Sequence, residues 1–89
     1  MAKRTKTDII NDMLVAIMDK GGTIKPTHLM YKANLSHNLL KGYLEELVEK
    51  EFVEEVEKNH FKYLTLTDKG SEFIERFKKM KEFEKSFGL

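Results

Sequence analysis

One segment of the chain changes its apolar pattern from a helical period to a strand period. Between residues 36 and 50, large apolar residues recur at i, i+1, i+4, i+5, i+8 and i+9, the spacing of one helical face. From residue 52 to residue 66, β-branched and aromatic residues flank the polar triplet Lys58-Asn59-His60. The first part predicts an amphipathic helix capped by Ser36, and the second predicts a β-hairpin. The helical residues expected to face the core are Leu39, Leu40, Tyr43, Leu44, Leu47 and Val48.

Two further helices are predicted before this segment. Apolar residues at helical spacing follow Thr7 and Asp8, either of which can cap the first helix, and Gly21-Gly22 ends it. A short extended piece follows, and Pro26, with its fixed φ and missing N–H, suits the opening of a second helix. That helix ends near Asn34-Leu35, which leaves a tight link to the helix of residues 36–50. The apolar residues of the first helix are Ile9, Ile10, Met13, Leu14, Ile17 and Met18.

The predicted order is helix, strand, helix, helix, strand, strand, helix, a mainly α architecture with a small β-hairpin (α+β). A tight link between the second and third helices is typical of a helix-turn-helix, and the hairpin directly after it makes the motif winged. A chain of 89 residues is expected to form one domain. We divide residues 1–89 into a basic N-terminal arm (1–6), a winged-helix body (7–66) and a C-terminal helix (67–87), which Thr67 caps.

Two segments resemble the winged helix-turn-helix superfamily. The first is MYKANLSHNLLKGYLEELVEKEFV at residues 30–53, and the second is YLTLTDKGSEFIERF at residues 63–77. More narrowly, the chain resembles small archaeal winged-helix proteins that dimerise through a C-terminal helix and act as regulators or chromatin-associated factors. The resemblance implies a homodimer that binds double-stranded DNA. The last helix departs from the pattern because it ends near Ser86, which leaves room only for a short coiled coil.

The third helix of a helix-turn-helix lies in the major groove, with its N-terminal residues toward the base edges. Asn pairs with adenine, Lys with guanine or phosphate, and Ser or His with either. The same residue types also occur on any solvated helix face. Gly42 lies inside this helix, where glycine is less favourable than alanine. It either lets the DNA backbone approach closely or is a tolerated change without a function. We expect base contacts from the outward residues Ser36, His37, Asn38, Lys41 and Gly42.

The formal net charge of +1 is unevenly divided along the chain. Residues 1–44 carry seven Lys or Arg against three Asp, and residues 45–89 carry nine against twelve acidic residues. This asymmetry predicts one basic face, on which phosphate contacts position the protein without specifying sequence. A modest net charge favours a sequence-selective regulator over a DNA-coating protein. The expected wing and backbone contacts are Lys58, Asn59, His60, Lys62, Lys3, Arg4, Lys6, Lys25, His28 and Lys32.

The last helix carries more large apolar residues than a small core can cover. Phe73, Ile74 and Phe77 are expected to cover the three-helix core, whereas the residues beyond them would stay exposed in a monomer. Burial of a Phe or Met contributes about 1.5–3 kcal/mol, which favours pairing with a second copy over exposure. The alternative is that the helix folds back onto its own domain. We expect a homodimer interface formed by Phe77, Met80, Phe83 and Phe87.

The sequence contains no pattern that predicts catalysis or metal binding. It has no cysteine, its three histidines lie in different predicted elements, and no glycine-rich phosphate loop is present. We therefore expect no enzyme activity, cofactor, metal or small-molecule substrate. No apolar run approaches the roughly 20 residues that span a bilayer, and no charged leader is visible, so a cytoplasmic, nucleoid-associated protein is expected. Two alternatives stay open: a protein–protein interaction module that works through its acidic strands, and a non-specific architectural protein that coats DNA.

Overall fold

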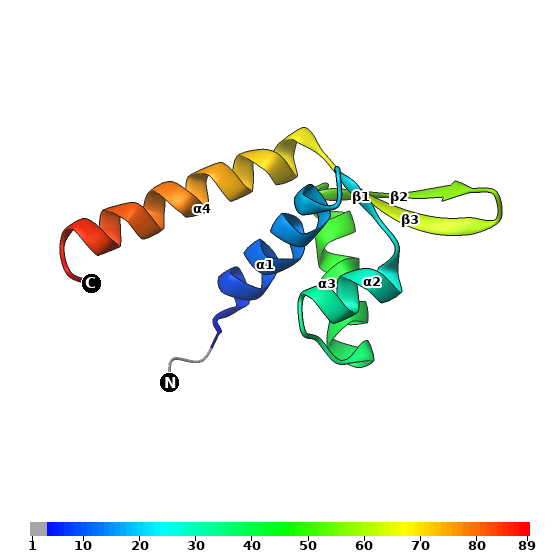
Figure 1. Cartoon of the computed structure of the whole chain (residues 1–89), viewed down its shortest axis with the longest axis horizontal. Helices are drawn as coiled ribbons and strands as arrows, with labels where there is room; N and C mark the ends of the chain where they lie inside the picture. Colours follow the sequence, from blue (N-terminus) through cyan, green and yellow to red (C-terminus); the bar gives the residue numbers. More distant parts are fainter. Residues whose placement is uncertain (1–3) are drawn as a thin grey trace.

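The computed structural model describes residues 4–89 and confirms the predicted order of elements (Figure 1). The bounds are α1 (Lys6–Asp19), β1 (Thr23–Ile24), α2 (Pro26–Lys32), α3 (His37–Glu49), β2 (Val53–Lys58), β3 (Phe61–Leu66) and α4 (Asp68–Ser86). The three strands form one antiparallel sheet of order β1-β3-β2, so the short strand β1 pairs with the β3 edge of the hairpin. Among the described residues, none of the helices combines the length and the apolar character that a membrane span requires.

The core is one apolar cluster to which α1, α2, α3 and the sheet all contribute. Met13, Leu14 and Ile17 of α1 are completely buried, so this helix forms the centre of the body. Leu40 and Leu47 anchor α3 against it, which turns the opposite side of α3 toward solvent. The orientation of α3 is therefore determined by core packing.

The first helix begins two or three residues earlier than predicted. Thr5 is its N-cap: its hydroxyl accepts a hydrogen bond from the Asp8 N–H at 3.1 Å, and the Asp8 carboxylate accepts one from the Thr5 N–H at 2.9 Å. This reciprocal pair is a capping box, so the prediction of Thr7 or Asp8 as the cap was wrong. At the other end of α1, Met18 falls at the helical spacing of the buried residues but is 44% exposed and lies outside the core.

The hairpin turns through two residues. Lys58 is paired with Phe61 across the strands, which leaves only Asn59 and His60 in the turn. Both have positive φ angles, 52° and 67°, the backbone conformation that matches the right-handed twist of a two-residue hairpin. The predicted three-residue turn was therefore one residue too long, because Lys58 belongs to β2.

The last helix leaves the sheet through a tight junction. Thr67 caps it as predicted, since its hydroxyl accepts from the Gly70 N–H at 3.0 Å. The same hydroxyl lies 2.6 Å from the Glu51 carbonyl oxygen and 3.0 Å from that of Phe52. Gly70 is buried where any Cβ would overlap the Phe52 carbonyl oxygen and lie 2.7 Å from Leu66 Cδ1. From this junction α4 runs past α1 and projects beyond the body, on the side away from the hairpin (Figure 1).

Candidate nucleic-acid interface

The N-terminal half of α3 presents the predicted base-contacting residues on one exposed surface. Ser36 caps the helix as predicted, with its hydroxyl accepting from the Leu39 N–H at 3.3 Å. Core anchoring of Leu40 behind them leaves the whole group accessible to a ligand. The exposed members are Ser36, His37, Asn38, Lys41 and Gly42.

Leu39 departs from the expected core stripe. It is 51% exposed, whereas Leu40 beside it is 5% exposed. The apolar stripe of α3 is wider than the surface that the neighbouring elements cover, so the part of the stripe in the first turn of the helix stays exposed to solvent. Leu39 lines a shallow hollow of about 240 Å³ on the surface of α3. The other residues that line it are Asn38, Gly42, Tyr43 and Glu46.

Gly42 leaves this hollow open. A Cβ added at Gly42 would meet no atom within 4 Å, so the missing side chain is not required by packing inside the protein. At the far edge of the hollow, the Glu46 carboxylate is 2.9 Å from the Lys6 ammonium. Lys6 belongs to α1 and not to a free arm, and its charge offsets that of Glu46. The hollow therefore carries little net charge.

The second helix lies beside the exposed surface of α3 and has a residue that the sequence pattern did not single out. His28 is half-buried and Lys32 is exposed. Tyr31 lies between them in sequence and is 73% exposed. A tyrosine hydroxyl donates to phosphate oxygens, so Tyr31 belongs with the candidate backbone contacts. Its place next to Lys32, on a helix expected to flank DNA, was the signal available in the sequence.

Arg4, which precedes α1, connects this helix to the turn between α2 and α3. Its guanidinium donates to the Ala33 carbonyl at 2.8 Å, to the Asn34 carbonyl at 3.2 Å and to Asp12 at 3.0 Å. Asn34 has a φ of 55°, so Arg4 bonds to the turn where the chain reverses from α2 into α3. The structure thus gives Arg4 intramolecular partners in place of the free position expected of an arm. Lys3 lies outside the described residues.

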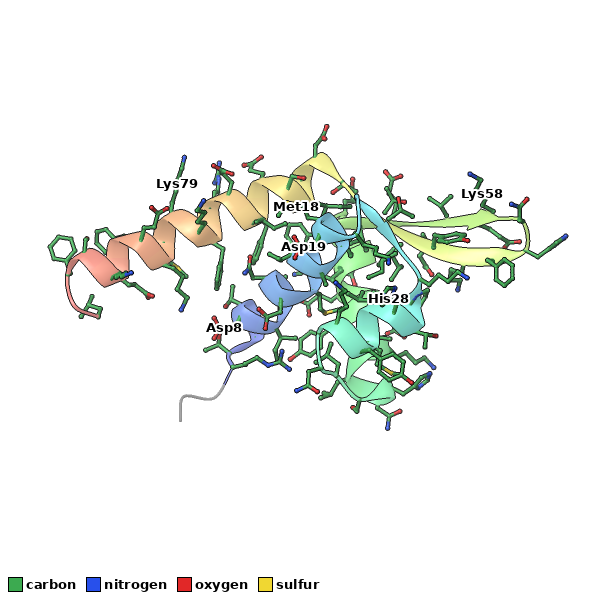
Figure 2. All side chains as sticks on the ribbon, viewed as in Figure 1. Asp8, Met18, Asp19, His28, Lys58 and Lys79 are labelled. Carbon is green, nitrogen blue, oxygen red and sulfur yellow. The ribbon has the colours of Figure 1, made fainter. Side chains whose placement is uncertain are left out.

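Both faces of the hairpin carry acidic and basic side chains, and Glu54 and Lys58 lie on the face opposite Glu55 and Lys62. Side chains alternate across the strands, so Glu55, Glu57 and Lys62 share the face that leads to the core, and Lys62 is 3.2 Å from Glu55. The other face carries Lys58 and Phe61, and the Lys25 ammonium lies 4.7 Å from the centre of the Phe61 ring. Lys58 lies near the free end of the hairpin and His28 lies on α2 (Figure 2).

A groove of about 440 Å³ separates α3 from the sheet. Pro26, Leu40, Leu44, Val48 and Leu64 form its apolar lining. The charges beside it have both signs, because His37 and Lys41 lie toward the start of α3 and Glu45 lies one turn further on. Its remaining lining residues are Glu55 and Lys62. The positively charged part of α3 is therefore its N-terminal half.

The far part of α4 carries the predicted dimer residues. Phe77 is half-buried and stacks on Phe73 with ring centres 6.1 Å apart, so it lies at the boundary of the body. Met80, Phe83 and Phe87 are 43%, 60% and 69% exposed. Phe83 and Phe87 contact each other, with ring centres 5.0 Å apart. Within the described part of the chain, these three side chains are therefore only partly covered.

The described residues contain no group of three or more His, Cys, Asp or Glu that could hold a metal ion. His28 lies in α2, His37 begins α3, and His60 lies in the hairpin turn. The three histidines therefore lie in separate elements of the described chain, with His37 and His60 exposed and His28 half-buried.

Comparisons with known proteins agree with this geometry. Sso10a-2, a DNA-binding protein from Sulfolobus solfataricus, superposes with a TM-score of 0.82 at 19% identity over 94% of this chain and 85% of that one. F93 from STIV, a winged-helix DNA-binding protein, gives 0.75 at 19% identity over 92% of each chain. SSV1 F-93 gives 0.67 at 25% identity over 96% of this chain and 99% of that one. No curated protein sequence matches the chain. The model of the winged helix-turn-helix family matches residues 3–85, and the chain therefore belongs to that family.

Proposed function

We propose that the protein binds double-stranded DNA as a homodimer, selects its sites by sequence and acts as a transcriptional regulator. The observation that carries the proposal is the N-terminal half of α3, where His37, Asn38 and Lys41 are exposed together on a helix fixed by the core. Their side chains supply the donors and acceptors that distinguish base pairs in the major groove. The similar structures Sso10a-2 and F93 are described as DNA-binding proteins, which supports the same interpretation.

In this proposal, α3 enters the major groove by its N-terminal half only. Glu45 and Glu49 are exposed further along the helix and would repel phosphates if the whole helix lay along the groove. Lys32 and Tyr31 of α2 contact the backbone, and the hairpin reaches an adjacent part of the duplex with Lys58 and its turn residues Asn59 and His60. Of the other predicted backbone contacts, Lys6, Lys25 and Lys62 each have an intramolecular partner that DNA would have to share or displace.

The exposed part of α4 supplies the dimer. Pairing two copies of Met80, Phe83 and Phe87 would remove their exposed apolar area from water and give two α3 helices at a fixed separation. A two-fold dimer predicts a target with two related half-sites, spaced by a whole number of helical turns. The protein would work in the cytoplasm on the nucleoid, with no cofactor or small-molecule substrate.

A protein–protein interaction module is the competing proposal. It is favoured by strand β2, on which Glu54, Glu55 and Glu57 are all exposed. An acidic strand of this kind suits a basic protein partner better than it suits DNA. The two proposals differ in which surface works, so mutation of α3 separates them.

The experiment is a fluorescence anisotropy titration of labelled random-sequence and selected duplexes at several salt concentrations. The test variant is Asn38→Ala/Lys41→Ala. The control for the loss of one positive charge is Lys79→Ala, on the side of α4 that faces away from α1 (Figure 2). Loss of an Asn pair and a Lys contact predicts at least about tenfold weaker binding to the selected duplex. The logarithm of affinity falls with the logarithm of salt by about 0.9 for each phosphate neutralised. Absence of binding at low salt would favour the acidic strand as the working surface. Equal binding to both duplexes would favour an architectural protein.

A further inference from the structure

We propose that the hollow on α3 is a contact site for the C5-methyl group of thymine, with Leu39 as its apolar wall. The site would make thymine a preferred base opposite the first turns of α3. This inference rests on the proposed function, because it requires α3 to lie in the major groove. It goes further by naming the base and the residue that selects it.

Leu39 has no apparent role in the fold. Among the exposed large hydrophobic side chains of the described chain, it is the one contributed by α3. Its backbone is nevertheless fixed, because its N–H donates to the Ser36 hydroxyl that caps the helix. An apolar side chain held at the start of a recognition helix, where base edges are read, fits an apolar feature of DNA.

The hollow beside Leu39 is shaped by an absent side chain. Gly42 lies one turn further along α3, and a Cβ placed there would have no atom within 4 Å apart from those of its two chain neighbours and of the helix's own backbone. Tyr43 lines the hollow on the core side, and Glu46 at its end is paired with Lys6. The floor is therefore free of side-chain atoms, and the nearest acidic group is offset by a lysine.

Thymine is the base that complements this surface. In the major groove it is the only base with an apolar group, the C5-methyl, beside its O4 acceptor. Asn38 lines the same hollow, and its amide can pair with the N6 and N7 atoms of an adenine. Leu39 and Asn38 together would thus favour A·T base pairs under the start of α3.

The test removes the methyl group from DNA and the apolar wall from the protein in turn. A preferred duplex is selected from a random library, and each thymine in it is replaced singly by deoxyuridine, which lacks only the methyl group. At one thymine per half-site we expect the wild-type protein to bind about fourfold more weakly, the effect of losing one buried methyl group. Leu39→Ala should bind the thymine and deoxyuridine duplexes equally at that position.

Two further variants keep the test independent of folding. Gly42→Ala adds a methyl group at the floor of the hollow without a clash, so it should fold normally, have an unchanged or raised Tm and bind the selected duplex about tenfold more weakly. The control is Met18→Ala, which removes a side chain of similar exposure, 44%, at the C-terminal end of α1 (Figure 2). Its affinity should fall by the same factor as that of the wild type when thymine is replaced by deoxyuridine.

The outcomes separate the inference from the function. Equal affinity of the wild-type protein for thymine and deoxyuridine at every position would overturn the thymine site and leave DNA binding intact. The same holds if the deoxyuridine effect persists undiminished in Leu39→Ala. Failure to enrich or bind any duplex would instead overturn the proposed function.

Discussion

The two halves of α4 have similar residues and opposite surroundings. In the first half, Phe73 packs edge-on against Phe52 at 5.3 Å between ring centres, and Ile74 is half-buried against the core. In the second half, Phe83 and Phe87 contact only each other among the described aromatic rings and are mostly exposed. Both halves present apolar residues at helical spacing, so the sequence pattern alone does not distinguish them. What differs is whether another element of the same chain reaches them.

This difference assigns separate tasks to the two halves. The first half completes the core and holds α4 at a fixed direction from the sheet through the Thr67 cap and the contact at Gly70. The second half adds nothing to the core and exposes apolar area that a second copy would bury. Changes in the first half should therefore lower the free energy of unfolding, whereas changes in the second should alter association and leave the fold intact.

The largest effect on the free energy of unfolding is expected from Gly70→Ala. The new methyl group would overlap the Phe52 carbonyl oxygen, which cannot move without disturbing the start of β2, and the Leu66 side chain. Overpacking of this kind costs about 1–3 kcal/mol and more where backbone is involved, so we expect the free energy of unfolding to fall by about 3 kcal/mol. Urea denaturation followed by circular dichroism would measure it.

The matched control for Gly70→Ala is Gly42→Ala, which makes the same chemical change inside another helix with no atom within 4 Å. It should raise stability by up to about 1 kcal/mol, because alanine is the better helix former. Similar effects of the two substitutions would show that the junction at Gly70 does not hold α4.

The second prediction concerns the second half of α4, where the test variant is Phe83→Ser/Phe87→Ser. The two phenylalanines are 60% and 69% exposed in the single chain, so their loss should change its fold little. If they lie in the dimer, each contributes about 1.5–3 kcal/mol, which predicts a dimer dissociation constant raised by at least about a hundredfold. Sedimentation equilibrium would measure association, and circular dichroism would confirm that helix content is kept.

The matched control for this pair is Lys78→Ser/Lys79→Ser on the same half of the helix, where Lys79 points away from α1 (Figure 2). It should leave association unchanged within a few fold. A wild-type protein that sediments as a monomer at high concentration would contradict the dimer and leave the exposed phenylalanines without an explanation.

The order of elements could be predicted from sequence because each was marked locally. Ser36 and Thr67 are polar caps directly before amphipathic helices, and the change from helical to alternating apolar spacing after Lys50 marked the hairpin. Pro26 opens α2 as expected. These signals act within a few residues, so no knowledge of distant parts of the chain was needed.

The candidate site was less predictable because it depends on contacts between distant residues. Leu39 fits the apolar stripe of α3 as well as Leu40 does, and only the packed structure shows that no element covers it. Arg4 resembled a free basic residue, but its partners at Ala33 and Asn34 are about thirty residues away in sequence. Which lysines remain free for phosphate is likewise determined by acidic partners that the spacing of charges does not reveal.

The smallest expected effect concerns the ion pair that joins the second half of α4 to the body. Lys81 lies 3.6 Å from Asp8 at the start of α1. Hydrogen bonds from the backbone N–H and then the hydroxyl of Thr5 lower the pKa of Asp8 from its usual 3.8, and Lys81 lowers it further. Because the folded pKa is below the unfolded one, this contribution to stability is fully present above pH 3.8 and is lost as the pH falls through the folded value.

Asp8→Asn should therefore lower the Tm slightly at pH 7, and the difference from wild type should shrink as the pH falls below 3.8 and the native carboxyl becomes protonated. Lys81→Ala should reproduce only the minor part of the loss, because the Thr5 hydrogen bonds remain. The effect is small because Lys81 is exposed and Asp8 only half-buried, so that water screens the pair. Thermal unfolding of the four members of the double-mutant cycle at pH 7 and over a series of acidic pH values would measure it. If the two substitutions proved strongly coupled, the second half of α4 would be held by its own body as well as by a partner.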